Sequence, residues 1–187
     1  MVFPGNVSMT PVGILMIEHR LIEHMIRLLS KELASIEGNK QVNSDFIDTA
    51  VDFIRTYADK CHHGKEEDIF FKVLITKKIK PQDKEYILEL IEEHKQGRAT
   101  IARLIAAKEN YIKKESKALD QIVECIKWLI DFYPKHIKKE DKHFFTLYRT
   151  HLSEEEQDNM LLDFLQFGEE STQDKYAKIV EDLERIF

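Results

Sequence analysis

The sequence is poor in glycine, proline and cysteine, and it lacks long apolar runs. Its 187 residues include only six Gly, four Pro and two Cys. So few chain breakers disfavour a many-turned β fold and favour long helices joined by short connections. Because no stretch approaches the roughly 20 consecutive apolar residues that a membrane span requires, we expect no membrane partner.

Positive charge is also in short supply. Lys and Arg total 28 against 34 Asp and Glu, which gives a net charge of -6 with no basic stripe. This balance argues against a nucleic-acid partner. The two cysteines, Cys61 and Cys125, make no disulfide framework, and the first residues show no charged segment followed by an apolar core. We therefore expect no secretory signal and a cytoplasmic location.

Apolar residues at helical spacing predict four long helices followed by a shorter helical part. Capping residues, proline and glycine give bounds of about 11–38 and 44–79, a third helix from Pro81 and a fourth from about Ser116. Ser153 with Glu156 predicts a capping box for a fifth helix, and a last amphipathic helix reaches Phe187. The expected fold is all-α: an antiparallel up-down four-helix bundle over residues 1–150, with a C-terminal helical extension, residues 151–187, packed on the same domain.

A histidine interrupts the apolar stripe near the middle of each of the four long helices. The four are His19, His62, His94 and His136, separated by 43, 32 and 42 residues. Each of these steps suits one long helix and a short loop. Because successive helices of an up-down bundle alternate in direction, the four positions return to the same layer of the bundle.

Two of these histidines are followed by a glutamate four residues later, as His62–Glu66 and His136–Glu140. Residues four apart lie on one face of a helix, so each pair directs a ring nitrogen and a carboxylate to one point. The overlapping pair His63 and Glu67 continues a polar line, so we interpret both as flanking residues or partners of a ligand, and a ligand role for His63 stays open. Glu23, four residues after His19, is either a ligand or a partner of a ligand.

A layer of four imidazoles and two carboxylates in a bundle core is costly unless something compensates it. Metal ions provide that compensation, and imidazole with carboxylate but no thiolate in phase indicates iron, manganese or zinc. Two carboxylates that bridge two ions, with two histidines on each, supply four protein ligands per ion. An oxo or hydroxo bridge adds a fifth and leaves an octahedral ion with one open position for a small molecule.

Four motifs together resemble the hemerythrin-like (HHE cation-binding) family over roughly residues 11–150. The motifs are Glu18-His19-Arg20, Cys61-His62-His63-Gly64-Lys65-Glu66-Glu67, Glu92-Glu93-His94-Lys95-Gln96-Gly97-Arg98 and His136-Ile137-Lys138-Lys139-Glu140-Asp141. The resemblance implies a non-heme site of two iron ions in an antiparallel four-helix bundle. It also implies that Glu66 and Glu140 bridge the ions and that the four histidines are terminal ligands.

The sequence departs from the oxygen-carrying hemerythrins at two positions. Those proteins carry two histidines four apart on the third helix, whereas here Arg98 stands four residues after His94. They also end the fourth-helix pair with an aspartate five residues after the histidine, whereas here Glu140 stands four after His136, with Asp141 directly behind it. The lost histidine weighs against reversible oxygen transport, and Glu23 is a candidate to fill the gap.

Two further residues near the predicted layer allow alternative interpretations. Gly97 in a helix costs about 1 kcal/mol relative to alanine, which indicates a close approach, either by a ligand beside His94 or by a neighbouring helix. Tyr133, one turn before His136, is interpreted as core packing or as a hydrogen-bond donor to a bound ligand. A ferritin-like site is disfavoured because it needs two Glu-x-x-His pairs, and only one is present, Glu140-Asp141-Lys142-His143.

The function that we expect is a cytoplasmic di-iron protein that binds or senses a small ligand such as oxygen, nitric oxide or peroxide. The alternative is a redox enzyme that acts on nitric oxide or peroxide, or that assists iron–sulfur cluster repair. No dedicated cysteine pair or electron-transfer module is visible in the sequence, so such an enzyme would need an external reductant. We therefore favour a binding protein over an enzyme. In a third interpretation, the metal only holds the helices of an interaction protein together.

Overall fold

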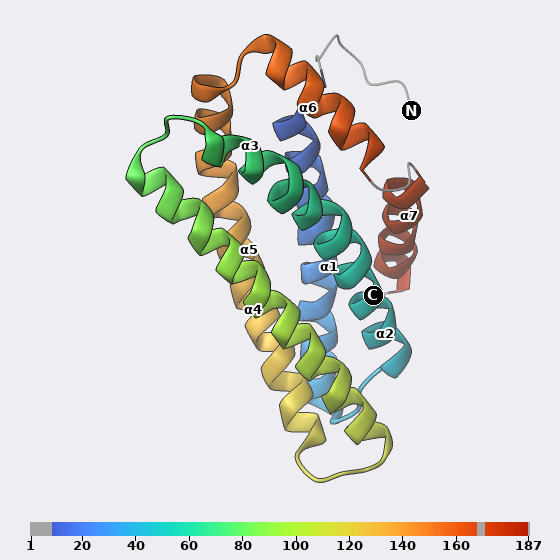
Figure 1. Cartoon of the computed structure of the whole chain (residues 1–187). Helices are drawn as coiled ribbons and strands as arrows, with labels where there is room; N and C mark the ends of the chain where they lie inside the picture. Colours follow the sequence, from blue (N-terminus) through green and yellow to red (C-terminus); the bar gives the residue numbers. More distant parts are fainter. Residues whose placement is uncertain (1–8, 168–170, 187) are drawn as a thin grey trace.

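A computed structural model describes residues 9–167 and 171–186, and Figure 1 shows its long helices side by side. The first eight residues, where we expect no secretory signal, lie outside the described part. Helices make up all the regular structure of the described residues, which confirms the all-α class. The bundle consists of α1 (Pro11–Asn39), a composite second helix, α4 (Pro81–Ile112) and α5 (Ala118–His151). No helix in these two ranges is both long and apolar enough to cross a membrane.

The ends of α1 follow from local chemistry. The Thr10 side chain accepts a hydrogen bond from the Gly13 amide at 3.1 Å, and Pro11 occupies the first helical position, where its missing N–H is not needed. The helix runs one residue past Gly38. Lys40 ends it in the left-handed region at φ 60°, and its amide bonds to the Ile36 carbonyl at 2.8 Å.

The second long helix changes its winding where the predicted metal ligands lie. It begins as α2 (Ser44–Asp52), continues as two π-helical segments, η1 (Phe53–His63) and η2 (Glu66–Phe70), and ends as α3 (Phe71–Thr76). A π-helix closes hydrogen bonds between residues five apart, so it takes more residues per turn than an α-helix. Residues five apart therefore share a face, and Phe53, Ala58 and His63 are all buried.

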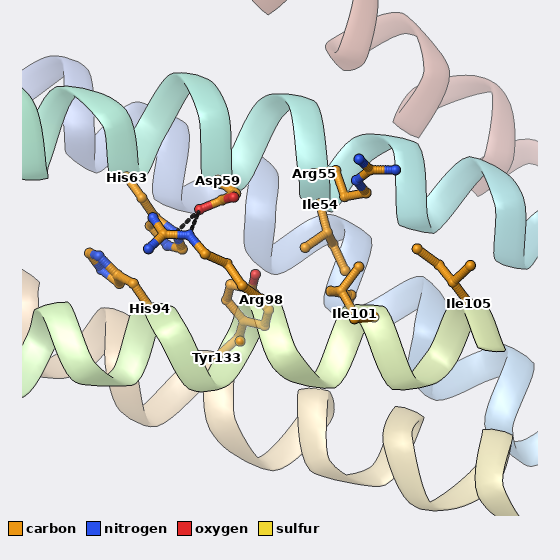
Figure 2. A pocket seen from close by; sticks show the side chains of 11 residues that line it. Ile54, Arg55, Asp59, His63, His94, Arg98, Ile101, Ile105 and Tyr133 are labelled. Atoms are coloured by element: carbon orange, nitrogen blue, oxygen red, sulfur yellow. Dashed lines mark hydrogen bonds and ion pairs between the residues drawn. The ribbon is translucent and has the colours of Figure 1, made fainter. Parts of the chain in front are cut away.

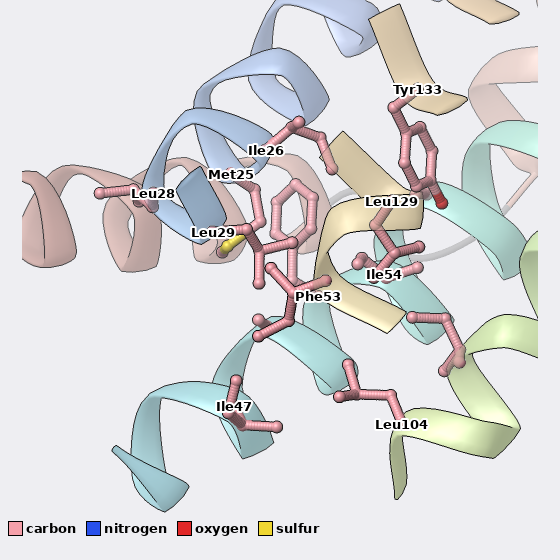
Figure 3. Packing of buried hydrophobic residues seen from close by; sticks show 14 of the residues in the cluster. Met25, Ile26, Leu28, Leu29, Ile47, Phe53, Ile54, Leu104, Leu129 and Tyr133 are labelled. Atoms are coloured by element: carbon pink, nitrogen blue, oxygen red, sulfur yellow. The ribbon is translucent and has the colours of Figure 1, made fainter. Parts of the chain in front are cut away.

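The predicted polar layer lies between two hydrophobic clusters along the bundle axis. On α1, Leu15 belongs to one cluster and Ile22 to the other, with His19 between them. On α4, Leu90 and Ile101 flank His94 in the same way. Figure 3 shows part of the larger cluster, in which residues of α1, α2, η1, α4 and α5 interdigitate. These clusters enclose the polar layer and exclude water from both sides of it.

The C-terminal extension consists of α6 (Glu154–Gln166) and α7 (Ser171–Ile186), which pack against α1 and the π-helical segments. Ser153 and Glu156 form the predicted capping box at the start of α6, which is confirmed. The buried Tyr176 of α7 donates its hydroxyl to Asp52 at 2.8 Å and contacts the ring of Phe53. The extension thus shares the core of the four long helices.

Gly64 and Phe167 form a contact between the extension and the π-helical part of the second helix. A Cβ atom added to Gly64 would lie 2.7 Å from Cε1 of the Phe167 ring, which is closer than packed carbon atoms approach. We expect Gly64→Ala to lower the free energy of unfolding by about 1–3 kcal/mol more in the wild-type background than in Phe167→Ala. The alanine at position 167 leaves room for the added methyl group, so the overpacking disappears. Chemical denaturation of the two single variants and the double variant measures this coupling. Purely additive free energies of unfolding would contradict it.

Candidate metal centre

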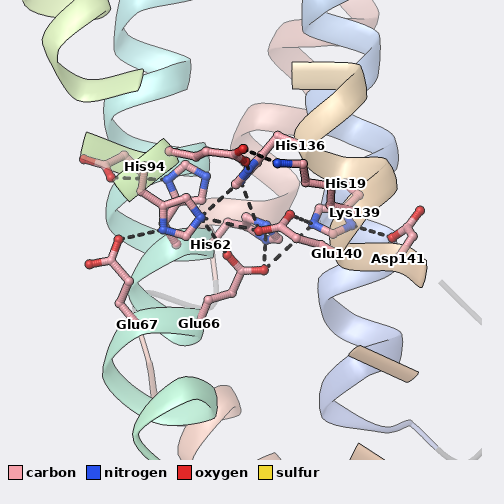
Figure 4. A network of polar contacts seen from close by, with 12 residues as sticks. His19, His62, Glu66, Glu67, His94, His136, Lys139, Glu140 and Asp141 are labelled. Carbon is pink, nitrogen blue, oxygen red and sulfur yellow. Dashed lines mark hydrogen bonds and ion pairs between the residues drawn. The ribbon is translucent and has the colours of Figure 1, made fainter. Parts of the chain in front are cut away.

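The structure brings seven imidazole and carboxylate side chains together in the middle of the bundle (Figure 4). One group contains His19, His62, Glu66 and Glu140, and a second contains His63, His94 and His136. Within each group, one donor atom per residue lies within 4.8 Å of every other. All seven residues are buried, and none has more than 3% of its surface exposed. Six of the seven are residues whose spacing in the sequence predicts this layer, and the seventh is His63.

The two glutamates lie between the histidine groups, and each presents its two oxygens to different rings. Glu66 Oε1 is 3.5 Å from His62 Nε2, while its Oε2 is 3.4 Å from His94 Nε2. Glu140 Oε2 is 3.1 Å from His19 Nε2, and its Oε1 is 3.0 Å from His136 Nε2. Each carboxylate therefore spans both groups, which is the arrangement that a bridge between two cations requires.

Several donor atoms of this site have no hydrogen-bond partner. Five buried side-chain polar atoms are unpaired among the residues that the structure describes, and four belong here: His19 Nε2, both oxygens of Glu66, and Glu140 Oε2. His19 Nε2 is close to Glu140 Oε2 but lacks the alignment of a hydrogen bond. Because unpaired buried polar atoms are costly and rare, their concentration at one point fits a site that metal ions complete.

Every histidine of the site has a carboxylate at Nδ1, which turns Nε2 toward the centre. The pairs are His19 with Asp141 at 2.7 Å, His62 with Glu18 at 3.0 Å, His94 with Glu67 at 2.7 Å, His136 with Glu93 at 2.7 Å, and His63 with Asp59 at 3.4 Å. A carboxylate that accepts the Nδ1 proton fixes the tautomer and the ring orientation of a metal-binding histidine. Four of the five carboxylates come from a different helical segment than their histidine.

A cation in turn holds each of these carboxylates. Arg98 donates to Asp59 at 2.7 Å and to Glu67 at 2.6 Å, so one guanidinium fixes the partners of both His63 and His94. The other pairs are Lys65 with Glu18, Arg20 with Asp141, and Lys139 with Glu93. The site is therefore built in three layers, with ring nitrogens inside, carboxylates around them and cations outside.

The electrostatics of the protein without bound ions show how strongly the two central carboxylates interact. Burial and the facing Glu140 carboxylate raise the pKa of Glu66 well above its usual range. Burial also raises the pKa of Glu140, but His136, His19 and His94 outweigh it and hold the pKa of Glu140 well below the usual range. Two carboxylates this close cannot both ionise easily unless positive charge lies between them.

The imidazoles divide into neutral and charged rings for similar reasons. Burial and the neighbouring His19 lower the pKa of His62 to about 4, and burial with His94 lowers that of His63. Burial also lowers the pKa of His136, but Glu140 and Glu93 outweigh it and raise that pKa to about 9. His62 and His63 are therefore neutral at pH 7 and ready to donate a lone pair to a cation.

The expectation that His63 lies on a polar line is wrong. His63 is 3% exposed, its ring stacks on that of His94 with centroids 3.8 Å apart, and it belongs to the second donor group. The α-helical phase that separates His62 from His63 does not apply, because η1 is a π-helix and both neighbours face inward. No signal of composition or spacing in the sequence marks this change of winding.

Glu23 lies outside the gathered donors. Its carboxylate accepts from Arg20 at 3.0 Å, and Arg20 also binds Asp141. Glu23 is thus a surface ion-pair partner, and the structure does not bring it to the other candidate ligands. The two cysteines, Cys61 and Cys125, are free thiols and belong to neither donor group.

The helical bundle and its buried nitrogen and oxygen donors are typical of helical metal-binding proteins. A family model described as the hemerythrin HHE cation binding domain matches residues 10–148, which is most of the chain. The chain therefore belongs to the hemerythrin HHE family, and this finding confirms the resemblance of its four motifs. Comparisons with curated proteins and with solved structures give no match.

Proposed function

We propose that this chain is a cytoplasmic non-heme di-iron protein that binds or senses a small ligand such as oxygen, nitric oxide or peroxide. The observation that carries the proposal is the set of buried, unpaired donor atoms of His19, Glu66 and Glu140, which face one another in a water-excluding layer. Nitrogen and oxygen donors without thiolate suit iron, manganese or zinc, and the resemblance to hemerythrin-like proteins favours iron.

The division of the donors supports a site for two ions. His19 and His62 serve one ion, and His63, His94 and His136 serve the other. Glu66 and Glu140 serve both, because each directs its oxygens to both groups. When bound, the iron pair supplies one-electron redox changes and open coordination positions for a small ligand. The chain's own residues orient the rings through their Nδ1 partners and keep bulk water out.

The experiment that tests this function uses full-length protein purified without added metal and then loaded with ferrous iron under nitrogen. We expect two irons per chain and a visible spectrum that changes on addition of oxygen, nitric oxide or peroxide. If all three leave the spectrum of the two-iron protein unchanged, ligand binding at this site is refuted. Steady-state consumption of nitric oxide or peroxide by the same sample, with an external reductant, would instead support a redox enzyme.

A further inference from the structure

A cleft of about 280 Å³ opens between η1 and α4 and reaches the candidate metal centre. Figure 2 shows His63 and His94 at one end of the cleft, and Arg55 and Ile105 toward the other. Its volume lies near the small end of the range for ligand pockets, about 300–1,000 Å³. The cleft therefore connects the surface to the two stacked histidines of the second donor group.

The walls of the cleft are largely apolar, with Ile54 on η1 and Ile101 on α4 facing each other across it. Gly97 completes the wall beside His94. A Cβ atom added to Gly97 would meet only the Phe132 ring, at an ordinary contact distance of 3.9 Å. Tight packing of a neighbouring helix therefore does not explain this glycine. Instead, the absence of a side chain at position 97 leaves space in the cleft.

Tyr133 is the one lining residue that combines deep burial with a neutral hydroxyl. It is 2% exposed and lines the cleft between the histidines and the isoleucines, as Figure 2 shows. Its hydroxyl has no hydrogen-bond partner within the described ranges 9–167 and 171–186. It is not one of the five fully buried unpaired atoms, so its oxygen borders the open space of the cleft. An unpaired O–H that faces an apolar cleft is thus available to donate to a molecule within it.

Two carboxylates offset the charge of Arg98, which lines the cleft. Arg98 lies along the cleft, but its guanidinium is already bound by Asp59 at 2.7 Å and by Glu67 at 2.6 Å. Because both carboxylates neutralise Arg98, its guanidinium has no free charge with which to bind a hydrated anion. Arg55 at the outer end of the cleft is exposed and keeps its charge in contact with solvent. Deeper in the cleft, the apolar walls and the neutral Tyr133 hydroxyl favour a small, weakly hydrated molecule that carries one hydrogen-bond acceptor.

We propose that this cleft is the entrance and the binding pocket for a small, weakly hydrated ligand of the dioxygen and nitric oxide class, and that the Tyr133 hydroxyl donates a hydrogen bond to it. The inference rests on the proposed function, because it names the route and the specificity residue of the same site. Gly97 keeps the route open. Tyr133 holds the ligand beside His63 and His94 and thereby lengthens its residence.

Xenon tests the cleft independently of any iron chemistry. Full-length protein loaded with zinc, a diamagnetic ion that accepts the same donors, is placed under xenon pressure. We expect shifts of the backbone amide NMR signals of Gly97 and Ile101, and loss of these shifts in Gly97→Leu. Ala99→Leu adds the same side chain to an exposed position of α4 and should retain them. Xenon shifts that spare these amides, or that persist in Gly97→Leu, would overturn the pocket.

Nitric oxide kinetics test the two residue roles in the iron-loaded protein. We expect Gly97→Leu to lose the fast association phase while it keeps the iron content of the wild type and of Ala99→Leu. Tyr133→Phe should keep the association rate and increase the dissociation rate about fivefold, the effect of one ordinary hydrogen bond. Unchanged association in Gly97→Leu would refute the route, and unchanged dissociation in Tyr133→Phe would refute the hydroxyl's role.

The two experiments separate this inference from the proposed function. A protein that binds xenon at Gly97 but gives no response to oxygen, nitric oxide or peroxide would support the pocket and refute iron-based ligand binding. A protein that responds to nitric oxide at the same rate in wild type and Gly97→Leu would support the function and refute the cleft as its entrance.

Discussion

Replacing Glu66 by alanine is expected to abolish the two-metal site, and Glu140→Ala should do the same. Each of these carboxylates directs one oxygen to each histidine group, so its loss removes a ligand from both ions at once. We expect metal content, measured by elemental analysis after gel filtration, to fall from two ions per chain to one or none. The spectroscopic signature of a coupled iron pair should disappear with it.

Matched variants of the same residue types show whether the loss is specific. Glu23→Ala removes a carboxylate that only pairs with Arg20 at the surface, so it should retain two ions. His24→Ala removes an exposed histidine paired with Glu184 and should also retain two. His63→Ala removes one of three imidazoles from the second group and should weaken one ion only. Two tightly bound ions in Glu66→Ala would contradict the bridging role, and unaltered binding in His63→Ala would exclude His63 as a ligand.

Removal of the metal is expected to destabilise the whole bundle. A ligand present at about 1,000 times its dissociation constant stabilises the folded state by about 4 kcal/mol. For a chain of this size that corresponds to a fall in melting temperature on the order of 10 °C on chelation. The unpaired atoms of His19, Glu66 and Glu140 supply the physical reason, because chelation leaves them buried without a counter-charge.

Thermal unfolding followed by circular dichroism, with and without a chelator, measures this effect. In Glu66→Ala the melting temperature should depend less on metal than in the wild type, because this variant binds at most one ion, and this provides the internal control. Equal melting temperatures for metal-loaded and chelated wild-type protein would show that the ions contribute nothing to the folded state. That result would also rule out the interpretation in which metal merely holds the helices together.

Much of the fold could be predicted from local patterns. The apolar spacing, Thr10-Pro11 at the start of α1 and the Ser153–Glu156 capping box depend on neighbours a few residues apart, and the helices appear where these signals place them. The end of α1 was harder to predict. The sequence predicts the end at Gly38, the residue that adopts a left-handed conformation most easily. In the structure Lys40 adopts that conformation instead, and its amide donates to the Ile36 carbonyl.

The sequence by itself determined that four helices each bring a histidine to a shared layer, with Glu66 and Glu140 one turn beyond two of them. Helical periodicity carries that information, since it depends only on residue spacing. Only the tertiary structure decided that His63 faces inward, that Glu23 stays at the surface with Arg20, and that Tyr133 and Gly97 line a cleft. The orientation of His63 depends on the π-helical winding. The other features depend on contacts between segments that are distant in the sequence, and such contacts produce no repeating pattern of residues along the chain.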